Sequence, residues 1–150
     1  MNKGAFFDRD GTINVDVNYL YKIEDFCFID GMPQFIKKFN DWGYKVIVVT
    51  NQAGIARGYY TEEGMHKLHH HINDELAKIG AHIDAFYFCP HHPDITGPCH
   101  CRKPESGMIE QAIRDFDIDV TQSILFGDKP WDIEAGENCG IVGYLTSDIT

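Results

Sequence analysis

One continuous apolar run restricts the fold of this 150-residue chain more than any other feature: the β-branched stretch Lys45-Val46-Ile47-Val48-Val49-Thr50. A strand that is apolar on both faces is typical of a parallel sheet covered by helices on either side. Further apolar runs predict strands at 4–7, 83–88, 123–126 and 141–145, and apolar residues at helical spacing predict helices near 32–39, 61–79, 109–116 and 133–137. Because strands and helices alternate, we predict one α/β domain over residues 1–150, with a parallel sheet and helices on both of its faces.

The bulk properties of the chain exclude several classes of function. The formal net charge is −10, and a broad nucleic-acid-binding surface would normally be basic. No apolar run approaches the roughly 18 residues that a membrane span requires, and the first residues lack the apolar segment of a secretory signal. We therefore expect a cytoplasmic monomer that binds neither nucleic acid nor membrane.

Polar residues follow the predicted strands where those strands end. Asp8, Thr50-Asn51, Cys89 and Asp128 each come directly after an apolar run. In parallel sheets, ligands bind beyond the carboxyl ends of the strands. Residues that are far apart in the sequence are therefore expected to meet at one edge of the sheet.

Two carboxylates lie two residues apart in Asp8-Arg9-Asp10-Gly11-Thr12. A carboxylate is a nucleophile that can form a covalent aspartyl intermediate, and a second carboxyl group can protonate a leaving group and later activate water. The alternative is a strand that simply ends in a polar turn, which Gly11 would permit.

Two further groups suit a phosphorylated ligand. Thr50 and Asn51 offer neutral donors for phosphoryl oxygens, although Thr-Asn is also an ordinary way to end a strand. The pair Arg102-Lys103 supplies the positive charge that a transferring phosphoryl group requires, and the alternative is a solvated basic pair.

Two acids four residues apart follow the fourth predicted strand, at Asp128 and Asp132. They can hold Mg²⁺, which prefers one or two carboxylates together with substrate oxygens. The alternative is a helix N-terminus that carries acidic residues because the helix dipole favours them there.

A second group of candidate ligands occupies one loop, with Cys89-x-His91 followed by Cys99-x-Cys101. Three thiolates and one imidazole suit a closed tetrahedral Zn²⁺ site. A redox-active or coincidental cysteine cluster is the alternative, and His92 and His100 are competing ligands. By contrast, His66, His69 and His70 share a helix face without an acidic or cysteine partner, and we interpret that face as solvated.

Taken in order, the four groups of residues at strand ends resemble the four motifs of the haloacid dehalogenase superfamily of phosphotransferases. The resemblance implies a Rossmann-like sheet. It also implies that Asp8 is the nucleophile, that Asp10 is the general acid and then base, and that Lys103 neutralises a phosphoryl group bound by Thr50 or Asn51. Mg²⁺ would be held by Asp8, the Asp10 carbonyl and Asp128, with Asp132 behind them. Residues 13–31 leave no room for a separate cap domain before the first helix.

The stretch from Cys89 to Pro104 narrows the resemblance, because it is similar to the zinc loop of bacterial D-glycero-D-manno-heptose bisphosphate phosphatases and related histidinol phosphatases. Residues 51–58 look more like those of the heptose enzymes. This implies that Cys89, His91, Cys99 and Cys101 bind Zn²⁺ and that Arg57 and Arg102 contact the substrate. The implied reaction is removal of the 7-phosphate from a heptose 1,7-bisphosphate, for nucleotide-activated heptose and lipopolysaccharide synthesis. The alternatives are histidinol-phosphate phosphatase and a non-catalytic zinc-stabilised binding module.

Overall fold

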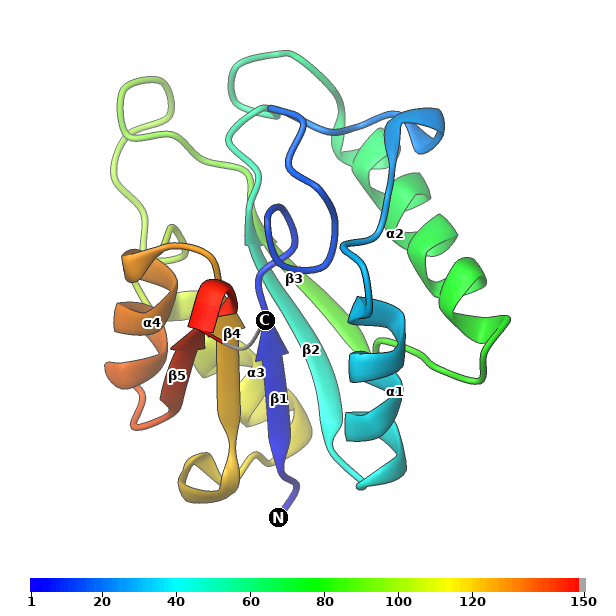
Figure 1. Ribbon diagram of the computed structural model, residues 1–150. Helices are drawn as coiled ribbons and strands as arrows, with labels where there is room; N and C mark the ends of the chain where they lie inside the picture. Colours follow the sequence, from blue (N-terminus) through cyan, green and yellow to red (C-terminus); the bar gives the residue numbers. More distant parts are fainter. Residues whose placement is uncertain (149–150) are drawn as a thin grey trace.

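The computed structural model describes residues 1–148 and has a central sheet flanked by helices (Figure 1). Its strands are β1 (Gly4–Phe7), β2 (Lys45–Asn51), β3 (Ala85–Cys89), β4 (Ile124–Gly127) and β5 (Val142–Leu145). Its α-helices are α1 (Met32–Asp41), α2 (Glu62–Ala77), α3 (Gly107–Phe116) and α4 (Pro130–Glu137). Single turns of 3-10 helix lie at η1 (Ile23–Asp25), η2 (Val120–Gln122) and η3 (Thr146–Asp148).

All strand pairs are parallel, and the strand order is β3-β2-β1-β4-β5. The predicted α/β class, with a parallel sheet, is therefore confirmed. The chain builds outward from β1 to β3 and then crosses back to place β4 on the other side of β1. This reversal of direction beside β1 is a topological switch point, where open α/β sheets bind their ligands.

Helices cover both faces of the sheet because side chains of the central strands alternate between two cores. Phe7 and Val48 point to the face covered by α1 and α2, whereas Phe6 and Ile47 point to the face covered by α3 and α4. All four side chains are fully buried. The apolar run that begins at Lys45 is thus explained by contact with helices on both sides.

Most element boundaries differ from the predicted ones by one to three residues, and two of these differences have local reasons. β3 begins at Ala85 rather than at residue 83, because Asp84 turns its carboxylate back to accept a hydrogen bond from the Val46 N–H at 2.8 Å. α4 begins at Pro130, since proline is well suited to the first position of a helix and the Asp132 carboxylate accepts from the Lys129 N–H at 3.1 Å.

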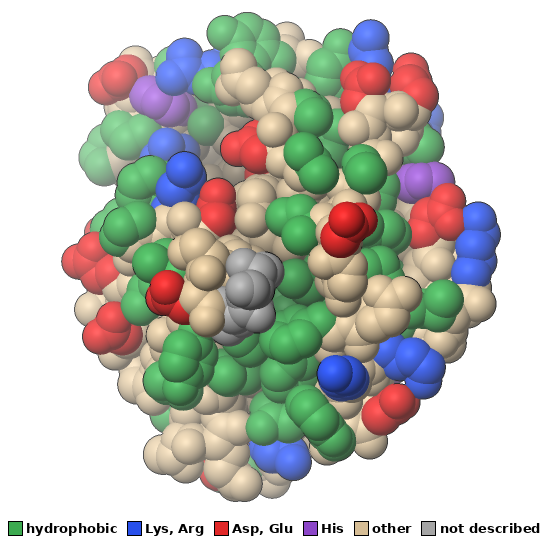
Figure 2. Space-filling model, in the orientation of Figure 1, with side chains coloured by type: hydrophobic (Ala, Val, Ile, Leu, Met, Phe, Trp, Pro, Cys, Tyr) green, Lys and Arg blue, Asp and Glu red, His purple; other side chains and the backbone are tan. Residues whose placement is uncertain are grey.

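Three loops rise above the carboxyl ends of the strands, at the top of Figure 1, and they comprise residues 8–31, 52–61 and 90–106. Within residues 1–148, none of these segments contains a separate cap domain. Acidic and basic side chains are interspersed on the face shown in Figure 2. No helix of the described part of the chain is long and apolar enough to cross a membrane.

Candidate active site

Asp8 and Lys103 meet at the end of β1 although 95 residues separate them. The Lys103 Nζ atom donates to Asp8 Oδ1 at 2.8 Å and to the Val49 carbonyl oxygen at 3.1 Å, and it lies 2.5 Å from Asp132 Oδ1. The side chain of Lys103 is almost fully buried. Its ammonium group therefore links the end of β1 to the start of α4, as the arrangement of strand ends predicts.

Asp128 completes an acidic cluster with Asp8 and Asp132. One carboxylate oxygen of each of the three lies within 4.8 Å of the others. Gly11 makes this approach possible, because a Cβ atom at that position would overlap the Asp128 carboxylate and its φ of +86° favours glycine. The sequence places Asp8 and Asp128 directly after their strands, and Gly11 lets the two carboxylates approach each other.

The charges of this cluster suit a divalent cation. Lys103 is the buried ammonium group of this cluster and contacts Asp8 and Asp132, whereas Asp128 has only the half-exposed Lys129 ammonium group at 4.0 Å, so carboxylates outnumber the buried positive charges. Burial raises the pKa of Asp8 to about 8 despite the attraction of Lys103, and burial also raises the pKa of Asp128. A bound cation would favour the ionised form of both carboxylates, so the residues present fit the predicted Mg²⁺.

Asp10 is held by donors on several sides. Arg9 donates to its carboxylate through Nε and Nη2 at 3.0 to 3.2 Å, and Asn14 Nδ2 donates to Oδ1 at 3.0 Å. Gln52 Nε2 reaches Oδ2 at 3.4 Å. Asp10 keeps part of its surface exposed to the cavity, so one carboxyl group is both oriented and accessible.

Thr50 and Asn51 are the last two residues of β2, next to this cluster. The Thr50 hydroxyl accepts from Gln52 Nε2 at 2.9 Å, and Asn51 Oδ1 accepts from the Lys103 backbone N–H at 3.1 Å. Tyr60 donates to Gln52 Oε1, and burial raises the pKa of Tyr60 to about 12, so its hydroxyl stays a donor. Asn51 thus helps to place Lys103.

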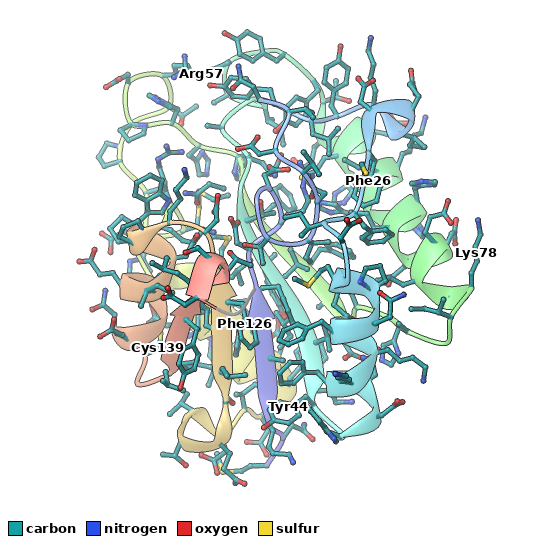
Figure 3. All side chains as sticks on the ribbon, viewed as in Figure 1. Phe26, Tyr44, Arg57, Lys78, Phe126 and Cys139 are labelled. Atoms are coloured by element: carbon teal, nitrogen blue, oxygen red, sulfur yellow. A yellow bond between two sulfur atoms is a disulfide. The ribbon has the colours of Figure 1, made fainter. Side chains whose placement is uncertain are left out.

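These residues line one cavity of about 350 Å³. The residues that form its wall come from the end of β2, the start of α4 and the loops after β1, β2, β3 and β4: Asp8, Asp10, Asp16, Asn18, Tyr19, Thr50, Asn51, Gln52, Ala53, Tyr60, Arg102, Lys103, Asp128, Lys129 and Trp131. Arg102 is among them. Arg57 is not: it lies in the loop at the top of Figure 3, where its Nη2 contacts His92 Nε2 at 3.0 Å.

The three predicted cysteine ligands also come together. Cys99 Sγ lies 3.6 Å from Cys89 Sγ and 3.7 Å from Cys101 Sγ. Tetrahedral zinc with Zn–S bonds of about 2.3 Å would separate its sulfur atoms by about 3.8 Å, so both distances fit one ion. The structure pairs Cys89 with Cys101 as a disulfide, which the sequence analysis did not predict. Among residues 1–148, His91 does not join the group of ligand atoms that lie within 4.8 Å of one another.

Sequence reasoning missed one residue next to the site and misread another. Arg9 is fully buried although it stands between the two catalytic candidates. The interpretation of the histidine face as solvated is wrong for His69, which is only 4% exposed and contacts Arg9. His69 lies between Met65 and Ile72 on the apolar stripe of α2, and that position was the signal for its burial.

Comparisons with known proteins agree with this geometry. A family model described as "Polynucleotide kinase 3 phosphatase" matches residues 3–133. A D-glycero-alpha-D-manno-heptose-1,7-bisphosphate 7-phosphatase from Photorhabdus laumondii is 49% identical over 160 residues, covering 99% of this chain and 87% of that protein. A D-glycero-beta-D-manno-heptose-1,7-bisphosphate 7-phosphatase from Haemophilus influenzae is 46% identical over 140 residues, covering 91% and 76%.

The chain belongs to the heptose-bisphosphate phosphatase family of haloacid-dehalogenase-like phosphatases. A solved member of this family, the D,D-heptose 1,7-bisphosphate phosphatase from B. bronchiseptica, superposes with a TM-score of 0.88 at 32% identity, covering 95% of this chain and 79% of that one. That structure was obtained in complex with magnesium and phosphate. The family thus contains a member that binds the metal and the anion for which the cluster of Asp8, Asp128 and Lys103 is suited.

Proposed function

We propose that this protein is a Mg²⁺-dependent phosphatase that hydrolyses the 7-phosphate of D-glycero-D-manno-heptose 1,7-bisphosphate. The observation that carries the proposal is the convergence of Asp8, Lys103 and Asp128 beside one cavity, in a chain with near full-length similarity to heptose-bisphosphate phosphatases. Because relatives with both the alpha and the beta anomer in their names are similar to this chain, the proposal covers the heptose bisphosphate without assigning the anomer.

Asp8 is the proposed nucleophile. Its carboxylate attacks phosphorus, the bond from phosphorus to the sugar oxygen breaks, and an aspartyl-phosphate forms on Asp8. Lys103 supports this step by placing a buried positive charge 2.8 Å from Asp8 Oδ1, where the transferring group gathers negative charge. Thr50 and Asn51 stand at the end of β2 to donate to the oxygens of that group.

Asp10 is the proposed general acid and then general base. In the first displacement it gives its proton to the departing sugar oxygen, and in the second it takes a proton from the water that hydrolyses the aspartyl-phosphate. The donors around its carboxylate, from Arg9, Asn14 and Gln52, fix the direction in which it faces. One carboxyl group can thus serve both halves of the reaction.

Mg²⁺ would be held by Asp8, the Asp10 carbonyl and Asp128, with Asp132 behind them. When bound, it reduces the repulsion between a carboxylate nucleophile and an anionic phosphate ester. Asp132 is in contact with Lys103, so it also orients the ammonium group that faces the phosphoryl group.

Zn²⁺ is the proposed structural ion of the loop that ends in Arg102-Lys103. Cys99 lies from both Cys89 and Cys101 at distances that fit the ion, reduction of the Cys89–Cys101 disulfide would supply the other two thiolates, and His91 remains the predicted fourth ligand. The ion would fix a loop that has no helix or strand of its own between β3 and α3. Its role is architectural, because the ion fixes the loop that positions Lys103 and neither the ion nor its ligands take part in a chemical step.

Arg102 is the proposed contact for the phosphate that the enzyme leaves in place, since it lines the cavity and an arginine fork can hold a phosphate through two hydrogen bonds. For Arg57, which lies outside the cavity lining, substrate contact remains a prediction. The net charge of −10 disfavours nucleic acid as the substrate. We further propose a cytoplasmic monomer that acts in nucleotide-activated heptose synthesis for lipopolysaccharide.

Release of phosphate from a small panel of esters tests this proposal. The panel comprises both anomers of the heptose 1,7-bisphosphate, histidinol phosphate and other sugar bisphosphates, each measured with and without Mg²⁺. We expect the highest kcat/KM for a heptose bisphosphate and loss of turnover without Mg²⁺. A higher kcat/KM for histidinol phosphate would favour that activity instead, and no turnover of any ester would favour a binding module.

A further inference from the structure

Arg9 is a charged side chain that is completely buried. Its Nε and Nη2 atoms donate to the Asp10 carboxylate, and Nη2 also donates to the Leu20 carbonyl oxygen at 3.1 Å. The remaining nitrogen, Nη1, lies 3.1 Å from His69 Nε2. Burying a guanidinium group costs free energy when any of its donors lacks a partner. The contact with His69 therefore stabilises the position of the Arg9 side chain.

The chemistry of this contact fixes the state of His69. Arginine can only donate hydrogen bonds, so His69 Nε2 must be the unprotonated acceptor and Nδ1 must carry the ring proton. Burial, together with the charges of Arg9 and His66, lowers the pKa of His69 to about 3, so the ring is neutral at neutral pH. The ring is stacked on Phe86 with centroids 4.2 Å apart, which holds it against β3.

The two oxygens of Asp10 have different surroundings. Oδ1 accepts from Arg9 Nε at 3.1 Å, from Arg9 Nη2 at 3.0 Å and from Asn14 Nδ2 at 3.0 Å. Oδ2 has only the longer contacts, at 3.2 Å to Arg9 Nη2 and 3.4 Å to Gln52 Nε2. Oδ2 is therefore the oxygen that is free to carry the proton for the leaving group.

We infer that His69 is a positioning residue for the general acid: it holds Arg9, and Arg9 turns the Asp10 carboxyl group so that Oδ2 faces the leaving oxygen. This inference rests on the proposed function, because it assigns His69 a task within that reaction. His69 itself touches neither substrate nor metal ligand. It acts from α2, a helix on which none of the predicted motif residues lies.

The role predicts a loss that depends on the leaving group. A sugar oxygen leaves poorly without a proton, so its departure needs a well-placed general acid. A nitrophenolate leaves without protonation. A misplaced Asp10 should therefore slow cleavage of the sugar ester and leave cleavage of a nitrophenyl ester almost unchanged, whereas general damage to the fold would slow both.

The test compares kcat/KM for heptose 1,7-bisphosphate and for p-nitrophenyl phosphate in three variants of the full chain. His69→Leu removes the acceptor, His69→Gln restores one through its amide oxygen, and His70→Leu is a matched control at an exposed position of the same helix. With the sugar ester, we expect a decrease of about 10- to 100-fold for His69→Leu. With the nitrophenyl ester, the same variant should lose less than about threefold, and the other two variants should resemble the wild type on both esters.

Equal losses on both esters, or no loss on either, would overturn the inference. Wild-type turnover of the heptose ester tests the proposed function separately, and if it fails, the same ratio is measured with whichever alkyl phosphate the wild type hydrolyses. If His69→Leu does not fold, long-range proton–nitrogen NMR of the wild-type His69 ring decides. Protonation at Nδ1 alone at neutral pH supports the contact with Arg9, and protonation at Nε2 overturns it.

Discussion

Replacing Lys103 by methionine should both destabilise the protein and nearly abolish its activity. The change removes the ammonium group of a residue that is only 5% exposed and keeps a side chain of similar length. Asp8, Asp132 and the Val49 carbonyl oxygen all lose their contact with Nζ. Breaking a buried ion pair from one side costs about 3–5 kcal/mol, and losing one donor to a developing anion lowers kcat by about 10²- to 10³-fold.

The loss of stability should grow with pH in the metal-free protein. The folded-state pKa of Asp8 is raised above its value in the unfolded chain. Its protonation therefore stabilises the fold at low pH, and this contribution is lost as the pH rises through about 8. Without Lys103 the pKa of Asp8 rises further, so ionising it costs more, and the difference between variant and wild type is larger at alkaline than at acid pH.

Urea denaturation of the metal-free proteins at several pH values measures this difference, and phosphate release measures the activity. Lys129→Met is the matched control for stability, because the Lys129 ammonium group is half-exposed and lies 4.0 Å from Asp128 Oδ2. That change should cost less than about 1 kcal/mol. A Lys103→Met protein with wild-type stability and turnover would refute the reasoning.

Three further predictions concern the nucleophile and the metals. Asp8→Asn should abolish turnover while Mg²⁺-dependent binding of the ester persists in a dialysis assay, and full residual activity would exclude Asp8 as the nucleophile. Because the pKa of Asp8 is raised to about 8, Mg²⁺ must displace one proton from Asp8 below that pH, and its affinity should fall by about tenfold for each pH unit. Calorimetry in two buffers counts the displaced proton, and an affinity independent of pH would contradict the raised pKa. Removal of zinc by a chelator, or Cys99→Ser, should lower the melting temperature by about 2–4 °C for each kcal/mol lost; purified protein without stoichiometric zinc would contradict the structural ion.

The architecture was predictable because its signals are local. The apolar run of β2 and the helical spacing of apolar residues fix which segments are strands and helices, and alternation of the two fixes a parallel sheet. The convergence of Asp8, Lys103 and Asp128 followed from the rule that parallel strands end at one edge. The boundaries were less predictable, because they depend on single side chains such as Asp84 that fold back onto a neighbouring strand.

The surroundings of Asp10 could not be predicted in the same way. Arg9 is charged, and its burial depends on partners that the fold brings from distant segments, including His69 from α2. His69 itself sits on the apolar stripe of its helix, yet a histidine among solvated neighbours gives no sign of an arginine partner. Side-chain contacts in long loops are also hard to predict from the sequence. One example is the Arg57 side chain, which contacts His92 outside the cavity.

The stereochemical course at phosphorus tests most directly whether Asp8 takes the phosphoryl group before water does. The wild-type enzyme would hydrolyse, in water enriched in ¹⁷O, a heptose ester whose transferred group is a phosphorothioate made chiral with ¹⁶O and ¹⁸O, and the configuration of the thiophosphate product would be compared with that of the ester. Each in-line displacement inverts the configuration, so attack by Asp8 followed by attack of water predicts overall retention. Overall inversion would mean that water attacks the substrate directly, and it would contradict the assignment of Asp8.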